Sequence, residues 1–252
     1  AHIPKRILKM NLLKDSIPGL IKKIALPASI GTLFQTLFNI VDTFFAGTIS
    51  PEALSALAKS FPIYFIIIAA CVGVTVGGTS LIANSIGENN KSKIHGYFAH
   101  TIIYAIIVSI FITAIGLSCA PYLFELMGSD TEVVQLGLSY TNVVFGGSVV
   151  FIMLVALNSL LHADGDTKTY RNVLILSFFL NILLNPLFIF GFGPVPAFGV
   201  AGIGIATIVA QFIGLVFIFI KASKSARIKD ISKKDFNFNS KILTNLFFQS
   251  AP

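Results

Sequence analysis

Hydrophobic residues fill six long stretches of the sequence, and short polar connections separate them. The stretches lie at residues 24–47, 61–86, 97–119, 137–160, 172–192 and 199–220. A helix that crosses the hydrocarbon core of a bilayer needs about 20 largely apolar residues. The pattern therefore predicts an all-α integral membrane protein with six transmembrane helices, and no connection is long enough to form a soluble domain.

Composition supports the same fold class. Charged side chains make up only 12% of the 252 residues, against about 25% in soluble globular domains. A disordered chain needs low hydrophobicity and high charge density, which this sequence lacks. Cys71 and Cys119 both lie in apolar stretches, so they offer no disulfide framework.

Lys and Arg are distributed very unevenly about the six stretches. Seventeen of the 18 lie before the first, after the second, after the fourth or after the sixth, and only Lys59 falls on the opposite side. An excess of Lys and Arg marks the cytoplasmic side. We therefore expect a multi-pass protein of the inner or plasma membrane with a cytoplasmic N-terminus. The net charge of +7 then reflects topology and anionic lipid contact, and nucleic-acid binding loses its support.

The spans also suggest how the chain is divided. Transporters are often built from two related halves, and the sequence ends just after a new apolar run begins. We expect a six-helix lobe that is the first half of such a protein. The predicted segments are a basic cytoplasmic N-terminus (1–23), the lobe (24–220), a basic cytoplasmic linker (221–245) and the start of a truncated seventh helix (246–252).

One carboxylate lies inside the predicted spans. Of eleven Asp and Glu residues, only Asp42 does so. Burial of a carboxylate in the bilayer costs a few kcal/mol or more, so such residues usually mark ion paths, proton relays or ligand sites. The alternative is a structural acid near a helix end that reaches interfacial water.

Other polar side chains fall at the same depth as Asp42. Gln35 and Asn39 share its helix face, because the spacing is i, i+4, i+7. On other predicted helices Asn181 and Asn185 are four residues apart, and Thr207 lies at a similar depth. Singly, such groups are more often helix–helix hydrogen bonds. Together, they predict an oxygen-rich pocket able to bind a proton or a metal ion such as Na⁺.

Three further features have structural or functional interpretations. Pro27 and Pro186 lie within predicted helices, where proline kinks the chain; a static kink and a hinge are both open. Gly73 and Gly77 form a small-residue pair that favours close helix packing over a site. The four His residues show no metal-ligand spacing.

Several motifs resemble the MATE (multidrug and toxic compound extrusion) family. They are Ile40–Gly47, Ala83–Asn90, Ala163–Thr167, Asn181–Gly191 and Gly199–Thr207. They occur in the family's order along nearly the whole chain, up to the point where the family's second six-helix lobe would begin. The resemblance implies one lobe of a two-lobe, roughly twelve-helix transporter.

The resemblance also implies a function and residue roles. The family exports organic, often cationic, compounds in exchange for H⁺ or Na⁺. Its N-lobe cation site would fall on Asp42, Asn181, Asn185 and Thr207. Gln35, Asn39 and Tyr140 would support that site, Asn158 would face the substrate cavity, and Pro27 would be the hinge. No cofactor is implied beyond the coupling ion, and we expect the full-length protein to be monomeric.

One position departs from part of the family. Some branches carry a second Asp where this chain has Asn185. An amide oxygen can coordinate Na⁺, but an amide does not titrate near neutral pH. Coupling to H⁺ and coupling to Na⁺ therefore both remain open.

Three alternatives compete with the antiporter. A lipid-linked oligosaccharide flippase of the same superfamily would place several cationic side chains in its cavity, and no Lys or Arg lies in a predicted span. A membrane enzyme would have to use His162, Asp164 and Asp166, but Asp164-Gly165-Asp166 is more typical of a turn. A scaffold or channel subunit is the third.

Overall fold

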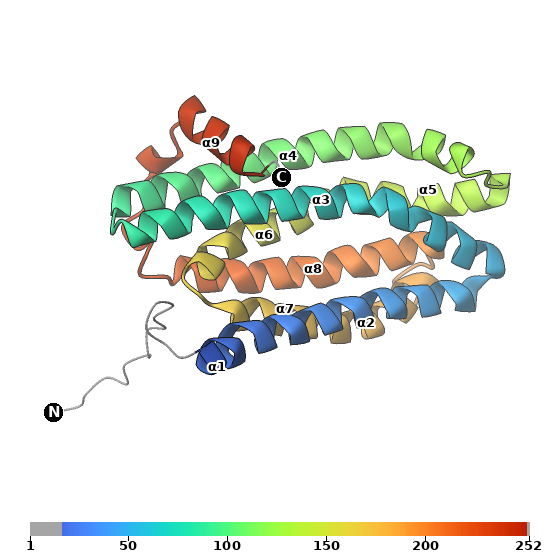
Figure 1. The fold of residues 1–252 in the computed structure, drawn as a ribbon. Helices are drawn as coiled ribbons and strands as arrows, with labels where there is room; N and C mark the ends of the chain where they lie inside the picture. The colour runs from blue at the N-terminus through green and yellow to red at the C-terminus, as the bar shows by residue number, and fades with distance from the viewer. Residues whose placement is uncertain (1–16, 251–252) are drawn as a thin grey trace.

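The computed structural model describes residues 17–250, and this part of the chain is almost entirely helical. A short lead-in of α1 (Ile17–Leu20) and a π-helical turn, η1 (Ile21–Ala25), continues into α2 (Leu26–Ile49). The other helices are α3 (Pro51–Gly87), α4 (Lys91–Leu126), α5 (Thr131–Gly146), α6 (Ser148–Ala163), α7 (Thr167–Phe190), α8 (Val200–Ser223), a 3₁₀ turn η2 (Lys233–Phe236) and α9 (Ser240–Ser250). The long helices lie side by side in one bundle (Figure 1).

Side-chain caps set several of these helix starts. Ser50, Asn90 and Asp166 each accept a hydrogen bond from a backbone N–H of the first turn, at 3.0, 3.1 and 3.0 Å. Such caps satisfy donors that the helix itself leaves unpaired. Pro51 follows Ser50 at the first position of α3, where its missing N–H costs nothing. The connections between the long helices are therefore short and defined.

The predicted spans correspond to these helices with two differences. Helices α3 and α4 extend well beyond the predicted 61–86 and 97–119. The predicted single span 137–160 is two helices, α5 and α6, bent by 40°. The break falls at Gly147, where an added Cβ would collide with the side chain of Ile208 on α8. Close approach of α8 to the bend explains why a glycine is needed there.

Length and hydropathy alone identify fewer spans than six. Within the described residues, α3, α4, α7 and α8 are long and apolar enough to cross a membrane, or five spans if α5 and α6 count as one bent pair. Helix α2 is not among them, because Gln35, Asn39 and Asp42 interrupt its apolar sequence. The bundle of α2, α3, α4, bent α5–α6, α7 and α8 nevertheless agrees with the predicted all-α membrane fold.

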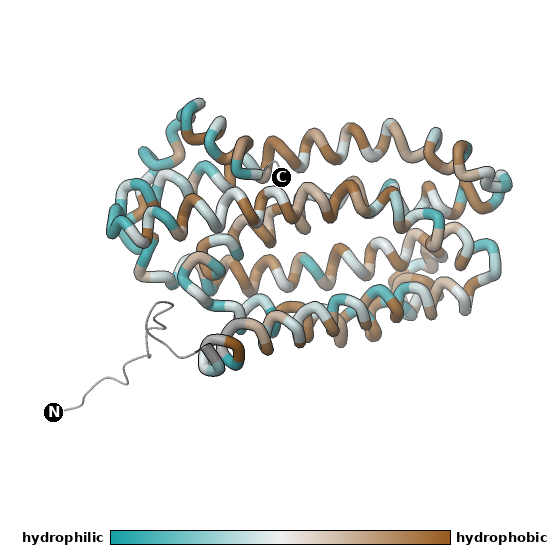
Figure 2. Tube along the Cα trace, in the orientation of Figure 1, coloured by the Kyte–Doolittle hydropathy of each residue, from teal (hydrophilic) through white to brown (hydrophobic). Residues whose placement is uncertain are grey.

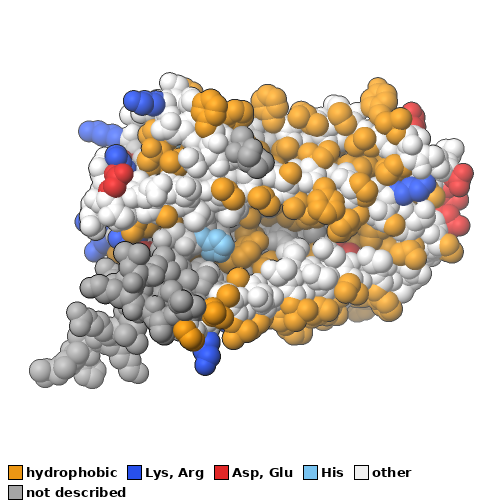
Figure 3. All heavy atoms as spheres, viewed as in Figure 1, with side chains coloured by type: hydrophobic (Ala, Val, Ile, Leu, Met, Phe, Trp, Pro, Cys, Tyr) orange, Lys and Arg blue, Asp and Glu red, His pale blue; other side chains and the backbone are white. Residues whose placement is uncertain are grey.

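Polar residues gather at the two ends of the bundle, and apolar residues cover its middle (Figure 2). Large apolar side chains such as Phe44, Phe111 and Leu183 are 65%, 65% and 68% exposed. Surfaces of this kind suit contact with lipid. We name the end that holds Lys91, Lys168 and Lys221 the basic end and the end that holds Glu52, Glu125, Asp130 and Glu132 the acidic end (Figure 3).

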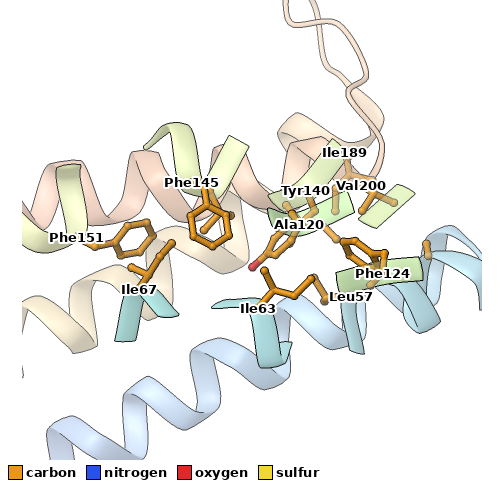
Figure 4. Packing of buried hydrophobic residues seen from close by; sticks show 14 residues of the cluster. Leu57, Ile63, Ile67, Ala120, Phe124, Tyr140, Phe145, Phe151, Ile189 and Val200 are labelled. Atoms are coloured by element: carbon orange, nitrogen blue, oxygen red, sulfur yellow. The ribbon is translucent and has the colours of Figure 1, made fainter. Parts of the chain in front are cut away.

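Inside the bundle, apolar side chains pack around α5. The rings of Phe124, Phe145 and Phe151 lie among Ile63, Ile67 and Tyr140 (Figure 4), in a cluster that runs from the middle of the bundle toward the acidic end. Gly137 allows this packing, because a Cβ there would collide with the ring of Phe124. A second buried cluster, which includes Ile94, Leu160 and Ile218, lies toward the basic end.

Helix α9 packs across the basic end of α3. Gly73 lies close to the carbonyl of Ser250, and Gly77 lies close to the carbonyl of Leu246; an added Cβ would come within 3.0 and 3.1 Å of these atoms. Leu246 is fully buried. The small-residue pair therefore has the packing role that the sequence favours.

Candidate functional site

Asp42 lies buried on α2, about two turns before that helix ends. Its Oδ1 accepts hydrogen bonds from Nδ2 of Asn181 (2.8 Å) and Nδ2 of Asn185 (3.0 Å), and its Oδ2 accepts one from the Thr207 hydroxyl (3.0 Å). All three donors are neutral. Among the described residues, no Lys, Arg or His forms an ion pair with Asp42.

Three helices bring this cluster together, and the helical repeat explains how. Asn181 and Asn185 are one turn apart on α7, so both face α2, against which α7 packs. Thr207 lies two turns into α8, which packs against α7 and also contacts α2. The structure thus brings together the four residues that the sequence predicts as a cation site.

One oxygen in the cluster has no partner. Asn185 donates through Nδ2 to Asp42 and to Oδ1 of Asn181 (3.0 Å), while its own Oδ1 is buried and unpaired. An unpaired buried acceptor costs about 1–3 kcal/mol. Each carboxylate oxygen can accept two bonds, and Oδ2 of Asp42 accepts one. The cluster therefore retains acceptor capacity, which a proton or a small hard cation can satisfy.

The Asp42 cavity, as we name it, lies beside this cluster in the acidic half of the bundle. Its volume is about 280 Å³. Its lining residues are Phe38, Asn39, Asp42, Thr43, Leu57, Ala58, Phe61, Tyr64, Tyr140 and Thr207. Tyr140 thus lies at the predicted place, but as part of the cavity wall and not as a hydrogen-bond partner of Asp42.

A second cavity, which we name the amide cavity, lies in the basic half and has a volume of about 360 Å³. Its polar lining comes from Gln35, Asn39, Asn158, His162, Tyr170 and Gln211. Asn158 is 1% exposed, and its Oδ1 has no hydrogen-bond partner. A buried amide oxygen of this kind is available to a ligand. The sequence placed Asn158 near a substrate cavity, and the structure puts it in this wall.

Several wall residues were not identified from the sequence. Gln211 could have been, because it lies four residues after Thr207 on the same face of α8. Tyr64 carries no such signal, because a lone aromatic in an apolar stretch is typical of ordinary core packing. His162 and Tyr170 lie outside the predicted spans, on either side of the polar turn between them. Only the packing of α3, α6 and α7 shows that these side chains face a cavity.

The two prolines have different surroundings. Pro27 is buried in the first turn of α2, directly after the π-helical turn η1. Pro186 lies inside α7, next to Asn185. Because proline has no N–H, it cannot bond to the carbonyl of Ile182 one turn earlier. Each proline therefore lies at a local irregularity of a helix that carries residues of the Asp42 cluster.

The remaining polar motifs have structural roles. Asp164-Gly165-Asp166 forms the turn between α6 and α7, with Gly165 at a φ of +82°. Asp164 pairs with Arg227 at 2.9 Å, and Asp166 caps α7. In the described part of the chain, no three His, Cys, Asp or Glu side chains gather as a metal cluster. A cation at Asp42 would have neutral oxygens as its other ligands.

Comparison with known proteins agrees with this geometry. The MatE family model matches residues 27–187. The chain is 30% identical over 211 residues to a probable multidrug resistance protein NorM of Thermotoga maritima, which covers 82% of this chain and 46% of that protein. It is 28% identical over 205 residues to the FAD transporter of Shewanella oneidensis, with 81% and 45% covered.

A solved structure shares the fold. A crystal structure of MATE in the bent conformation superimposes with a TM-score of 0.82 at 30% identity, over 92% of this chain and 51% of that one. The helical bundle with a buried polar cluster thus has the fold of about half of that MATE structure. The chain belongs to the MatE family, as its motifs suggested. It spans about half the length of the curated relatives that it matches.

Proposed function

We propose that the protein is a cation-coupled antiporter that exports organic, often cationic, compounds across the inner or plasma membrane, with H⁺ or Na⁺ as the coupling ion. The supporting observation is the buried Asp42 with its three neutral donors and the unpaired Oδ1 of Asn185. A carboxylate without a basic partner favours binding of a proton or metal cation, since burial penalises the bare charge.

The coupling requires two states. The cation and the substrate must favour different conformations, because a ligand with equal affinity for both shifts nothing. We propose that cation binding at Asp42 tightens the contacts between α2, α7 and α8 and reshapes the amide cavity, where Asn158 would contact substrate. Pro27 would act as the hinge at the base of α2.

The composition of the amide cavity supports the proposal that the substrates are small organic compounds. Its walls combine aromatic and aliphatic side chains with four amides, a composition typical of ligand pockets. The relatives are described as a multidrug resistance protein and an FAD transporter, so drug-like cations and a flavin nucleotide are both worth assay. The absence of Lys and Arg from the predicted spans argues against an oligosaccharide flippase.

The test uses the full-length protein in proteoliposomes. Export of ethidium, norfloxacin or FAD is followed under an imposed pH gradient or an imposed Na⁺ gradient, with Asp42→Asn beside the wild type. We expect one gradient to drive transport and Asp42→Asn to abolish it. Normal gradient-driven export by Asp42→Asn would overturn the cation role of Asp42. Transport of no compound under either gradient would overturn the antiporter.

A further inference from the structure

The Asp42 cavity and the amide cavity meet at two residues. Among the described residues, only Asn39 of α2 and Tyr64 of α3 line both cavities. Figure 3 shows the surface hollowed between the lower helices, which include α2, and α3 above them. The two cavities thus lie end to end along the bundle, with Asn39 on one wall and Tyr64 on the other at their junction.

We propose that Asn39 and Tyr64 form the constriction through which the coupling cation passes between Asp42 and the amide cavity. This rests on the proposed function of Asp42 as the cation site. Neither residue is part of that site: within the described chain, hydrogen bonds to Asp42 come from Asn181, Asn185 and Thr207 alone. Asn39 and Tyr64 are positioning residues that set the cation's route.

Polar groups continue from Asp42 through the junction. Asn39 lies three residues before Asp42 and Gln35 four residues before Asn39, so the three share one face of α2 at intervals of about 5 Å along the axis. Across the amide cavity, the unpaired Oδ1 of Asn158 and the buried Gln211 offer further amide groups. A cation leaving a carboxylate needs such oxygens, because bare passage past apolar walls is costly.

Much of the remaining wall of both cavities is apolar. Leu57 and Phe61 line the Asp42 cavity, and Ile67 and Phe151 line the amide cavity. The ring of Tyr64 packs edge-on against Phe151, with centroids 6.0 Å apart. That contact fixes the ring at the junction. We therefore infer that the bulk of the Tyr64 ring separates the two cavities. The amide of Asn39 is the polar group that the cation meets as it passes.

The first test measures access and does not depend on transport. Cys71 lines the amide cavity and serves as a native reporter, with Cys119→Ala and any cysteines elsewhere in the full-length protein replaced. A membrane-impermeant thiol reagent is added from each side in turn. We expect it to reach Cys71 from one side only in the parent and in Tyr64→Phe, and from both sides in Tyr64→Ala. Equal labelling from both sides in the parent, or one-sided labelling in a monodisperse Tyr64→Ala, would overturn the partition.

The second test measures the cation step. Asn39→Leu removes the amide, keeps the branching at Cγ and leaves the three described hydrogen bonds of Asp42 in place. We expect gradient-driven transport to slow about tenfold with the half-saturating cation concentration unchanged. Thr36→Val is the matched control, because Thr36 is exposed on α2 and its hydroxyl bonds only to the carbonyl of Thr32. Normal transport by Asn39→Leu would overturn the proposed cation route. No transport by the wild type would overturn the antiporter function, and Cys71 labelling would then still test whether Tyr64 separates the two cavities.

Discussion

At the scale of single residues, the site depends on neutral hydrogen-bond donors around one carboxylate. In the part of the chain that the structure describes, Thr207 is the only donor to Oδ2 of Asp42, while two amides share Oδ1. A hydrogen bond to a charged group contributes about 1.5–3 kcal/mol. Thr207 therefore holds the orientation of the carboxylate that a cation would meet.

Thr207→Val tests this contribution, because it removes the hydroxyl and keeps the shape. For Na⁺ coupling, we expect the half-saturating Na⁺ concentration for transport to rise about tenfold, because the hydroxyl oxygen is lost as a ligand. For H⁺ coupling, we expect the half-saturating H⁺ concentration to fall, because the carboxylate loses a donor that stabilises its charged form. Both are measured in proteoliposomes over a cation titration. Thr36→Val, away from the cavities on α2, should leave it unchanged. An unaltered titration in Thr207→Val would show that Oδ2 does not meet the cation.

Lys59, the one basic residue that the described chain places at the acidic end, acts as a helix cap. Its Nζ donates to the carbonyls of Met127 (3.3 Å) and Gly128 (3.4 Å) and to the Ser129 hydroxyl (3.0 Å). These groups follow the end of α4, where a cation also meets the negative end of the helix dipole. This capping contact explains why a lysine occurs at the acidic end of the bundle.

Lys59→Met should lower the thermal unfolding temperature in detergent, corresponding to a loss of about 1 kcal/mol. The control is Lys91→Met, because Lys91 and Asp230 form an exposed pair at 3.8 Å and such pairs contribute little. Equal effects of the two substitutions would contradict the cap.

At the scale of elements, the segment between α8 and α9 is held by local polar contacts. Asp235 accepts from the backbone N–H of Ser232 (2.8 Å) and from its hydroxyl (3.1 Å). The pKa of the Asp235 carboxyl is lowered below its usual value, mainly by the backbone hydrogen bond from Ser232. The nearby His95 lowers this pKa further. At the end of this segment, His100 Nε2 accepts from the backbone N–H of Asn239 (3.0 Å).

The lowered pKa of Asp235 gives a pH dependence. A carboxyl with a depressed folded-state pKa stabilises its surroundings above its unfolded value, and that stabilisation is lost as pH falls through the folded value. We expect hydrogen exchange of η2 to be steady from pH 8 to 5 and, after correction for intrinsic rates, to lose protection below about pH 4. Asp235→Asn should remove this acid-dependent loss; the same loss in that variant would contradict the assignment.

At the scale of the whole molecule, the distribution of charge predicts orientation. The connection between α3 and α4 lies at the basic end, and the connection between α4 and α5 lies at the acidic end. Positive charge is retained on the cytoplasmic side. The basic end should therefore face the cytoplasm and the acidic end the opposite compartment.

Single-cysteine labelling in intact cells tests this orientation. With native cysteines replaced, Ser129→Cys should react with an impermeant reagent from outside, and Asn89→Cys should react only after permeabilisation. Both positions lie in connections between long helices. Ser129→Cys keeps a side chain of similar size beside Lys59, and Asn89, at a φ of +53°, is exposed. The reverse pattern would invert the proposed topology.

The sequence alone determined the class of the fold and much of the candidate site. Apolar length predicts membrane helices whatever their packing, and the i, i+4, i+7 spacing puts Gln35, Asn39 and Asp42 on one face of α2 because a helix repeats every 3.6 residues. Helix direction and depth then bring Asn181, Asn185 and Thr207 to the level of Asp42.

Only the tertiary structure decided how those faces meet. At the α5–α6 bend, Gly147 leaves room for the side chain of Ile208 of α8, and the cavity walls at Tyr64 and Tyr170 depend on how α3 and α7 are rotated. Contacts between residues far apart in sequence arise from packing, which local periodicity does not encode. For the same reason the unpaired Oδ1 of Asn185 could be recognised only after every neighbouring donor had been placed.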